Sequence, residues 1–147
     1  MVQQSSPPSL GIGRVLVVVY GILALAATGR SGVQIATKFD DAPLAYVLSA
    51  VSAVVYILAT VALVSRGSRW YAVAWLTISF ELLGVLVVGL LSVADPALFP
   101  ADTVWSGFGR GYLFVPLVLP VLGMLWLYRR RPQNRTDAEV GVASSRR

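Results

Sequence analysis

The residue best placed to do chemistry is Glu81, a single carboxyl group inside a predominantly apolar run from Tyr71 to Val93. A run of this length is typical of a membrane-spanning helix, which needs about 20 apolar residues. A carboxylate near the middle of a bilayer costs about 2.5–3.5 kcal/mol on insertion scales, so such groups face protein or water and have a partner. We therefore expect Glu81 to point into a helix bundle.

Arg30 is the predicted partner of Glu81. Counted from the cytoplasmic side at 1.5 Å per residue, Glu81 lies about 15–18 Å along its helix and Arg30 about 22–24 Å along its own. An extended arginine side chain spans that offset, and a bidentate pair would lower the cost of both charges. Tyr56 and Thr77 could donate further hydrogen bonds. The expected intramembrane polar centre is therefore Arg30, Glu81, Tyr56 and Thr77.

The composition argues against an enzyme and against cofactor or metal binding. The chain has no cysteine and no histidine, which removes thiol chemistry, zinc sites of the usual kind and the commonest general base. Asp40 and Asp41 are adjacent in a loop, where neighbouring side chains diverge. We interpret them as solvated; a calcium or magnesium cluster with Asp95 and Asp102 is the alternative.

Four apolar segments organise the chain, at about 14–36, 44–64, 70–93 and 112–128. The first contains an uninterrupted run of only 14 residues, Val15 to Thr28, and reaches a spanning length if it continues through Arg30 to Ala36. The predicted fold is all-α: a four-helix transmembrane bundle over 14–128. A disordered segment, 1–13, precedes it, and a basic disordered cytoplasmic tail, 129–147, follows it.

The start of the chain allows a second interpretation. Arg14, the apolar stretch and Ala24-Leu25-Ala26 also resemble a cleavable signal peptide. We favour a retained first span, because the segment after Ala26 stays semi-apolar and the later spans suffice for insertion.

Arginine placement predicts that both termini are cytoplasmic. Six basic residues then lie on the inside near the membrane, against three on the outside, Arg30, Lys38 and Arg110. The six are Arg14, Arg66, Arg69, Arg129, Arg130 and Arg131. This distribution assigns the net charge of +5 to membrane topology and to anionic lipid headgroups at the basic inner face, and not to nucleic acid.

Small and polar residues predict how the helices pack, since membrane helices meet through such residues. One stripe is Ala45, Ser49, Ser52, Tyr56 and Ala59; the other is Ala74, Thr77, Glu81, Gly84, Val88 and Ser92. Pro116 and Pro120 should kink the fourth span. The outer loop from Ala94 to Gly111 should lie at the interface and cover the bundle mouth, as a fixed cover or as a functional lid.

Several stretches resemble small four-span integral membrane proteins of actinobacteria, among them Gly29-Arg30-Ser31-Gly32, Asp41-Ala42-Pro43-Leu44 and Phe99-Pro100-Ala101-Asp102. The resemblance implies the plasma membrane of a high-GC Gram-positive bacterium and brings no activity. Three functions stay open: a structural protein with a buried Arg30–Glu81 pair, a subunit that docks onto a larger membrane protein or a second copy, and a small proton-coupled transporter using Glu81.

Overall fold

The computed structural model describes residues 8–130 and 144–145, and within these ranges it contains helices and no strands. The long helices are α1 (Pro8–Lys38), α2 (Pro43–Val64), α3 (Ser68–Ala94) and α4 (Val115–Arg129). Four 3-10 turns connect them: η1 (Phe39–Asp41), η2 (Pro96–Leu98), η3 (Ser106–Phe108) and η4 (Arg110–Tyr112). The predicted all-α class is confirmed.

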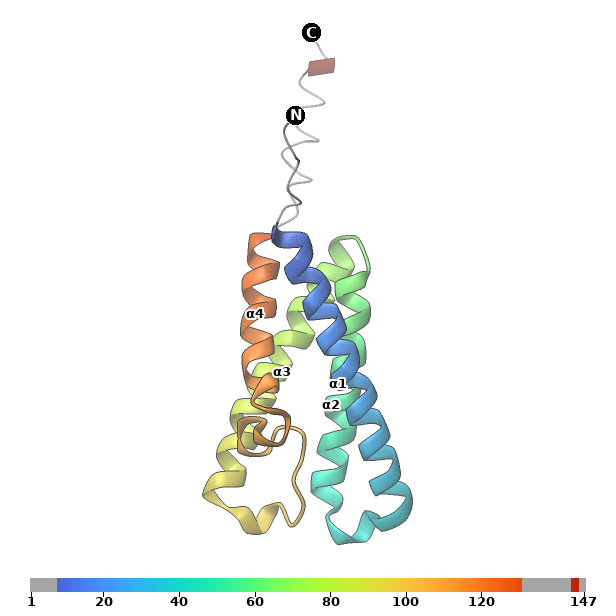
Figure 1. The fold of residues 1–147 in the computed structure, drawn as a ribbon, viewed down its shortest axis with the longest axis vertical. Coiled ribbons are helices and arrows are strands. Elements are labelled where there is room, and N and C mark those ends of the chain that lie inside the picture. The colour runs from blue at the N-terminus through green and yellow to red at the C-terminus, as the bar shows by residue number, and fades with distance from the viewer. Residues whose placement is uncertain (1–7, 131–143, 146–147) are drawn as a thin grey trace.

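The four long helices form an antiparallel bundle (Figure 1). Helix α1 packs along α2, α2 along α3 and α3 along α4, while α1 also contacts α4. Gly13 of α1 lies against the indole of Trp126 in α4, so the start of the first helix meets the end of the last. This end carries five exposed arginines, Arg14, Arg66, Arg69, Arg129 and Arg130, and is called the basic end below; the opposite end is called the loop end.

The helix boundaries differ from the expected ones by more than two residues at two places. Helix α1 begins at Pro8, so part of the segment expected to be disordered is helical, and proline is well suited to a first turn. Helix α4 begins at Val115, three residues later than expected. Residues 1–7 and most of the tail, 131–143 and 146–147, lie outside the described residues.

Three helices of the described chain, α1, α2 and α3, are long and apolar enough to cross a membrane. A fourth crossing requires the segment of η3 and η4, Ser106–Tyr112, together with α4. These two parts are bent by 97° at the break between them. The outer faces of the helices are apolar: Leu25 is 78% exposed and Leu76 is 72% exposed. This surface is suited to a lipid environment.

The interior of the bundle contains most of the two small and polar stripes; Gly84 and Ser92 of the α3 stripe are only half-buried. Every member of the α2 stripe is at most 1% exposed, namely Ala45, Ser49, Ser52, Tyr56 and Ala59. On α3, Ala74, Thr77, Glu81 and Val88 are buried. Close packing through small residues is the expected way for apolar helices to associate without water.

The sharp bend before α4 does not lie where the prolines predicted a kink. Pro116 occupies the first turn of α4, where a missing backbone donor costs little, and Pro120 lies inside the helix. The chain turns instead at Leu113 and Phe114, which have φ values of 57° and 60°. Left-handed conformations of such residues cost about 1–3 kcal/mol each. Leu113 is 87% exposed, and the bend is closed by a 3.0 Å hydrogen bond from the Phe114 N–H to the Gly109 carbonyl.

Candidate functional site

Glu81 lies at the middle of α3, thirteen residues from Ser68 and thirteen from Ala94. Its side chain is 0% exposed and faces the centre of the bundle. At 1.5 Å per residue, each end of the helix is about 20 Å away. The predicted placement of Glu81 on an inward-facing seam is therefore confirmed.

The carboxyl group of Glu81 is bound by Tyr20 of α1. The Tyr20 hydroxyl donates a hydrogen bond of 2.7 Å to Oε2. Oε1 is buried and has no hydrogen-bond partner among the described residues. Each helix packs mainly against its two neighbours, with α1 and α3 both next to α2 and α4, so this bond connects the two helices across the diagonal of the bundle.

Two more aromatic side chains complete the surroundings of the carboxyl group. The rings of Tyr20 and Tyr56 lie 6.3 Å apart at an angle of 48°. The Tyr56 hydroxyl accepts a 2.9 Å hydrogen bond from the indole nitrogen of Trp105, which comes from the loop between α3 and α4. Trp105 is 2% exposed and meets Phe80 edge-on. A chain of contacts therefore leads from the Glu81 carboxyl group through Tyr20 and Tyr56 to Trp105.

Arg30 is not the partner of Glu81 in this structure. Its guanidinium donates a 2.9 Å hydrogen bond to the backbone carbonyl of Asp102, and no described ion pair joins it to Glu81. The reason is the register of α1. Tyr20 is level with Glu81, and Arg30 lies ten residues further along the helix, about 15 Å towards the loop end. An arginine side chain does not reach back over that distance.

The other two predicted residues are buried close to this level but do not bind the carboxyl group. Thr77 donates to the carbonyl of Val73 at 2.9 Å, within its own helix, and its contact with the Ala74 carbonyl is longer, at 3.2 Å. This use of a threonine hydroxyl is common inside helices. Tyr56 acts as acceptor for Trp105, so it supports the site indirectly.

The loop segment is packed tightly against α3. A Cβ added at Gly84 would lie 2.6 Å from the Trp105 ring, and one added at Gly89 would lie 2.5 Å from the Phe108 ring. The backbone N–H of Gly107 donates a 2.8 Å hydrogen bond to the Ser92 hydroxyl. Both glycines on α3 are therefore needed so that the two aromatic rings can approach its backbone.

The sequence interpretation missed Tyr20 and the inward position of Trp105. Tyr20 is the only hydroxyl-bearing side chain between Val15 and Ala27, which was a usable signal, since a polar group within a span needs a partner. The loop that carries Trp105 was expected to lie at the interface, whereas Trp105 is 2% exposed inside the bundle. Nothing in the local sequence indicates that the loop turns back into the bundle.

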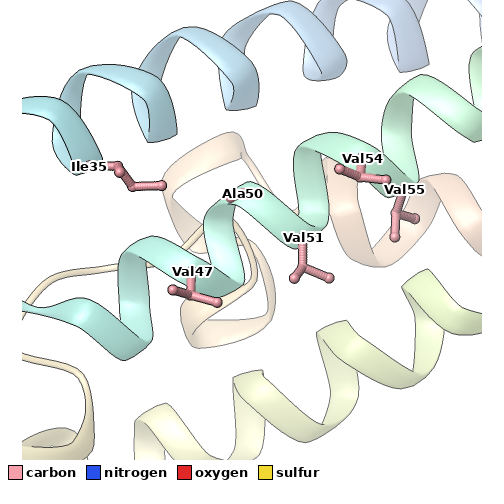
Figure 2. A pocket seen from close by; sticks show the side chains of 6 residues that line it. All are labelled: Ile35, Val47, Ala50, Val51, Val54 and Val55. Atoms are coloured by element: carbon pink, nitrogen blue, oxygen red, sulfur yellow. The ribbon is translucent and has the colours of Figure 1, made fainter. Parts of the chain in front are cut away.

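Two shallow apolar grooves on the surface of the described structure are not lined by Glu81. One groove lies between α1 and α2 and is lined by aliphatic residues only, Ile35, Val47, Ala50, Val51, Val54 and Val55 (Figure 2). A second groove of similar character also involves α1 and α2. Within residues 8–130 and 144–145, no group of three acidic residues could hold a metal ion.

No protein-family model, curated protein or solved structure matches the chain.

Proposed function

We propose that this chain is a multi-pass protein of the plasma membrane, with four crossings and both termini in the cytoplasm, in an actinobacterium as the sequence resemblance implies. The arginines support this orientation. The basic end carries five exposed arginines and no acidic residue within the described chain. The loop end combines three basic residues with four acidic ones, Asp40, Asp41, Asp95 and Asp102. A basic cytoplasmic face of this kind also favours contact with anionic lipid headgroups.

Within the membrane we propose a structural or accessory role, and the diagonal Tyr20–Glu81 hydrogen bond carries this proposal. Helices α1 and α3 pack against α2 and α4 and hardly against each other, so this hydrogen bond links them directly. Interhelical hydrogen bonds of this kind select which helices meet and in which register. A bundle fixed in this way can present its apolar outer faces to a larger membrane protein or to a second copy of the chain.

A second candidate function is proton-coupled transport through Glu81. It is favoured by two observations: Oε1 is buried without a partner, and no cation of the described chain is paired with the carboxyl group. An ionised carboxylate in such surroundings is costly because its charge is buried and unpaired, whereas a neutral acid has no charge that needs a partner. A group that exchanges a proton with water must be free of a permanent cation.

Replacing Glu81 by glutamine and by leucine separates the two functions. Glutamine keeps an oxygen that can accept the Tyr20 hydrogen bond but cannot titrate, whereas leucine removes the acceptor. A structural role predicts that Glu81→Gln keeps the stability of the fold, that Glu81→Leu lowers it, and that liposomes containing the wild type show no proton flux above empty liposomes.

A transport role predicts proton flux across wild-type proteoliposomes, measured with an enclosed pH-sensitive dye, that Glu81→Gln abolishes. Asp95→Asn is the matched control, because Asp95 is an exposed acid at the end of α3. Flux that survives Glu81→Gln, or that falls equally in both variants, would contradict the assignment of transport to this residue.

A further inference from the structure

The fourth position of the bundle is filled by a helix over only part of its length. Helix α4 has 15 residues, about 22 Å, whereas α3 has 27, about 40 Å. At the loop end, the remaining space is occupied by residues 99–112, which turn back beside α3 before α4 begins (Figure 1). We call this segment, 99–112, the plug.

The plug covers Glu81 from the loop end. Gly84 lies three residues, about one helical turn, beyond Glu81 on the same face of α3, and the Trp105 ring lies directly against it. Trp105 is also bonded to Tyr56, whose ring contacts that of Tyr20. Trp105 therefore lies between Glu81 and the loop end on this face of α3.

The plug has hydrogen bonds of its own and packs closely on α3, but few hydrogen bonds attach it to the helices. Ser106 Oγ accepts a hydrogen bond of 2.8 Å from the backbone N–H of Thr103, and the two hydroxyls lie 3.0 Å apart. Besides the bond from the Trp105 indole to Tyr56, two hydrogen bonds join the plug to the helices within the described chain: the Arg30 guanidinium donates to the Asp102 carbonyl, and the Gly107 N–H donates to the Ser92 hydroxyl. No helical or sheet ladder binds it to the bundle.

The connection between the plug and α4 is under strain. Leu113 and Phe114 both have positive φ, as does Phe108 within the plug. Gly109 has a φ of 83°, and a side chain there would meet the ring of Pro116 at 2.8 Å. Residues in such conformations cost about 1–3 kcal/mol each and cluster at segments that change conformation. Leu113 is 87% exposed, so little packing opposes a change there.

We propose that residues 99–112 form a gate that closes the loop-end route to Glu81, and that the gate opens as a unit when Trp105 leaves Gly84 and Tyr56. Opening admits water, and with it protons, to the carboxyl group. The proposal concerns access to Glu81 and holds for either function given above.

Cysteine labelling tests the gate directly, since the chain has no cysteine of its own. The reporter is Val85→Cys, at a 0% exposed position on α3 next to Gly84. The control is Ala74→Cys, a 1% exposed position on the same helix but on the basic side of Glu81. The rate of reaction of each with a water-soluble maleimide is measured on the full chain in detergent.

The gate is then loosened by Arg30→Gln together with Ser92→Ala, which remove two attachments without changing a core aromatic residue. We expect labelling of Val85→Cys to accelerate about tenfold, a change that losing two ordinary hydrogen bonds allows, while labelling of Ala74→Cys stays unchanged. If Val85→Cys does not fold, Val88→Cys replaces it. An unchanged rate at the reporter, or equal acceleration at both positions, would overturn the proposal.

Discussion

The contact between Gly84 and Trp105 predicts that an added methyl group at position 84 destabilises the protein. In Gly84→Ala, the new Cβ would lie 2.6 Å from Trp105 Cζ3 and 2.9 Å from two further ring atoms. Carbon atoms normally approach to about 3.5–4.0 Å, so the ring must move by roughly 1 Å. It has little freedom to do so, because it is 2% exposed and bonded to Tyr56.

The magnitude follows from two opposing effects. Overpacking of a core costs about 1–3 kcal/mol, and loss of the indole–Tyr56 hydrogen bond adds about 1 kcal/mol. Alanine returns up to about 1 kcal/mol through its higher helix propensity. We expect Gly84→Ala to lower the free energy of unfolding by about 1–3 kcal/mol.

Reversible unfolding in mixed detergent micelles measures this change. Gly32→Ala is the matched control: Gly32 lies in α1, and an added Cβ there meets nothing within 4 Å. The control should be neutral or stabilising. The cost of Gly84→Ala should also shrink in a Trp105→Phe background, where a smaller ring leaves room. A neutral Gly84→Ala, or a cost that is the same in both backgrounds, would refute the packing argument.

Three further predictions follow from the remaining contacts. Arg30→Gln should change stability by no more than about 1 kcal/mol in the same unfolding assay, because its hydrogen bond is exposed; a loss of several kcal/mol would indicate a buried charge pair. Tyr71→Phe should cost about 0.5–1.5 kcal/mol, since the Tyr71 hydroxyl donates to the Leu127 carbonyl at 2.9 Å; no loss would show that this bond contributes nothing. In intact cells, an impermeant thiol reagent should label Asp40→Cys and spare Ser68→Cys; the reverse pattern would contradict cytoplasmic termini.

The sequence predicted the interior of the bundle better than its connections. The spacing of small residues along 45–59 and 74–92 placed Tyr56, Thr77 and Glu81 on buried faces, because helical periodicity determines which side chains share a face. That Glu81 needs a partner also followed from its cost in a membrane. Each of these inferences depends only on the residue pattern within a single helix.

The identity of that partner required the relative heights of two helices, which the sequence did not determine. The predicted heights assume that the cytoplasmic ends of the first and third spans lie at one level. In the structure, the residue that reaches Glu81 is Tyr20, only six residues after Arg14. The predicted offset between the two helices along the bundle axis is therefore wrong by several ångströms, and Arg30 lies too far towards the loop end.

The inward turn of the loop was also beyond sequence reasoning. Gly107-Phe108-Gly109 matches no phosphate or dinucleotide motif, and the structure shows that its glycines take positive φ in a tight turn. Trp105 binds Tyr56 only because Gly84, on a different helix, leaves space for its ring. Such a fit depends on tertiary packing, which local composition does not encode.

The central claim is that Glu81 is held by Tyr20 and not by Arg30, and two double-mutant cycles measured by unfolding in detergent test it directly. For Tyr20→Phe with Glu81→Leu, we expect a coupling free energy of about 0.6–1.7 kcal/mol, the range found for interhelical hydrogen bonds in membranes. For Arg30→Gln with Glu81→Leu, we expect additivity within about 0.5 kcal/mol. Coupling in the arginine cycle with none in the tyrosine cycle would contradict the account.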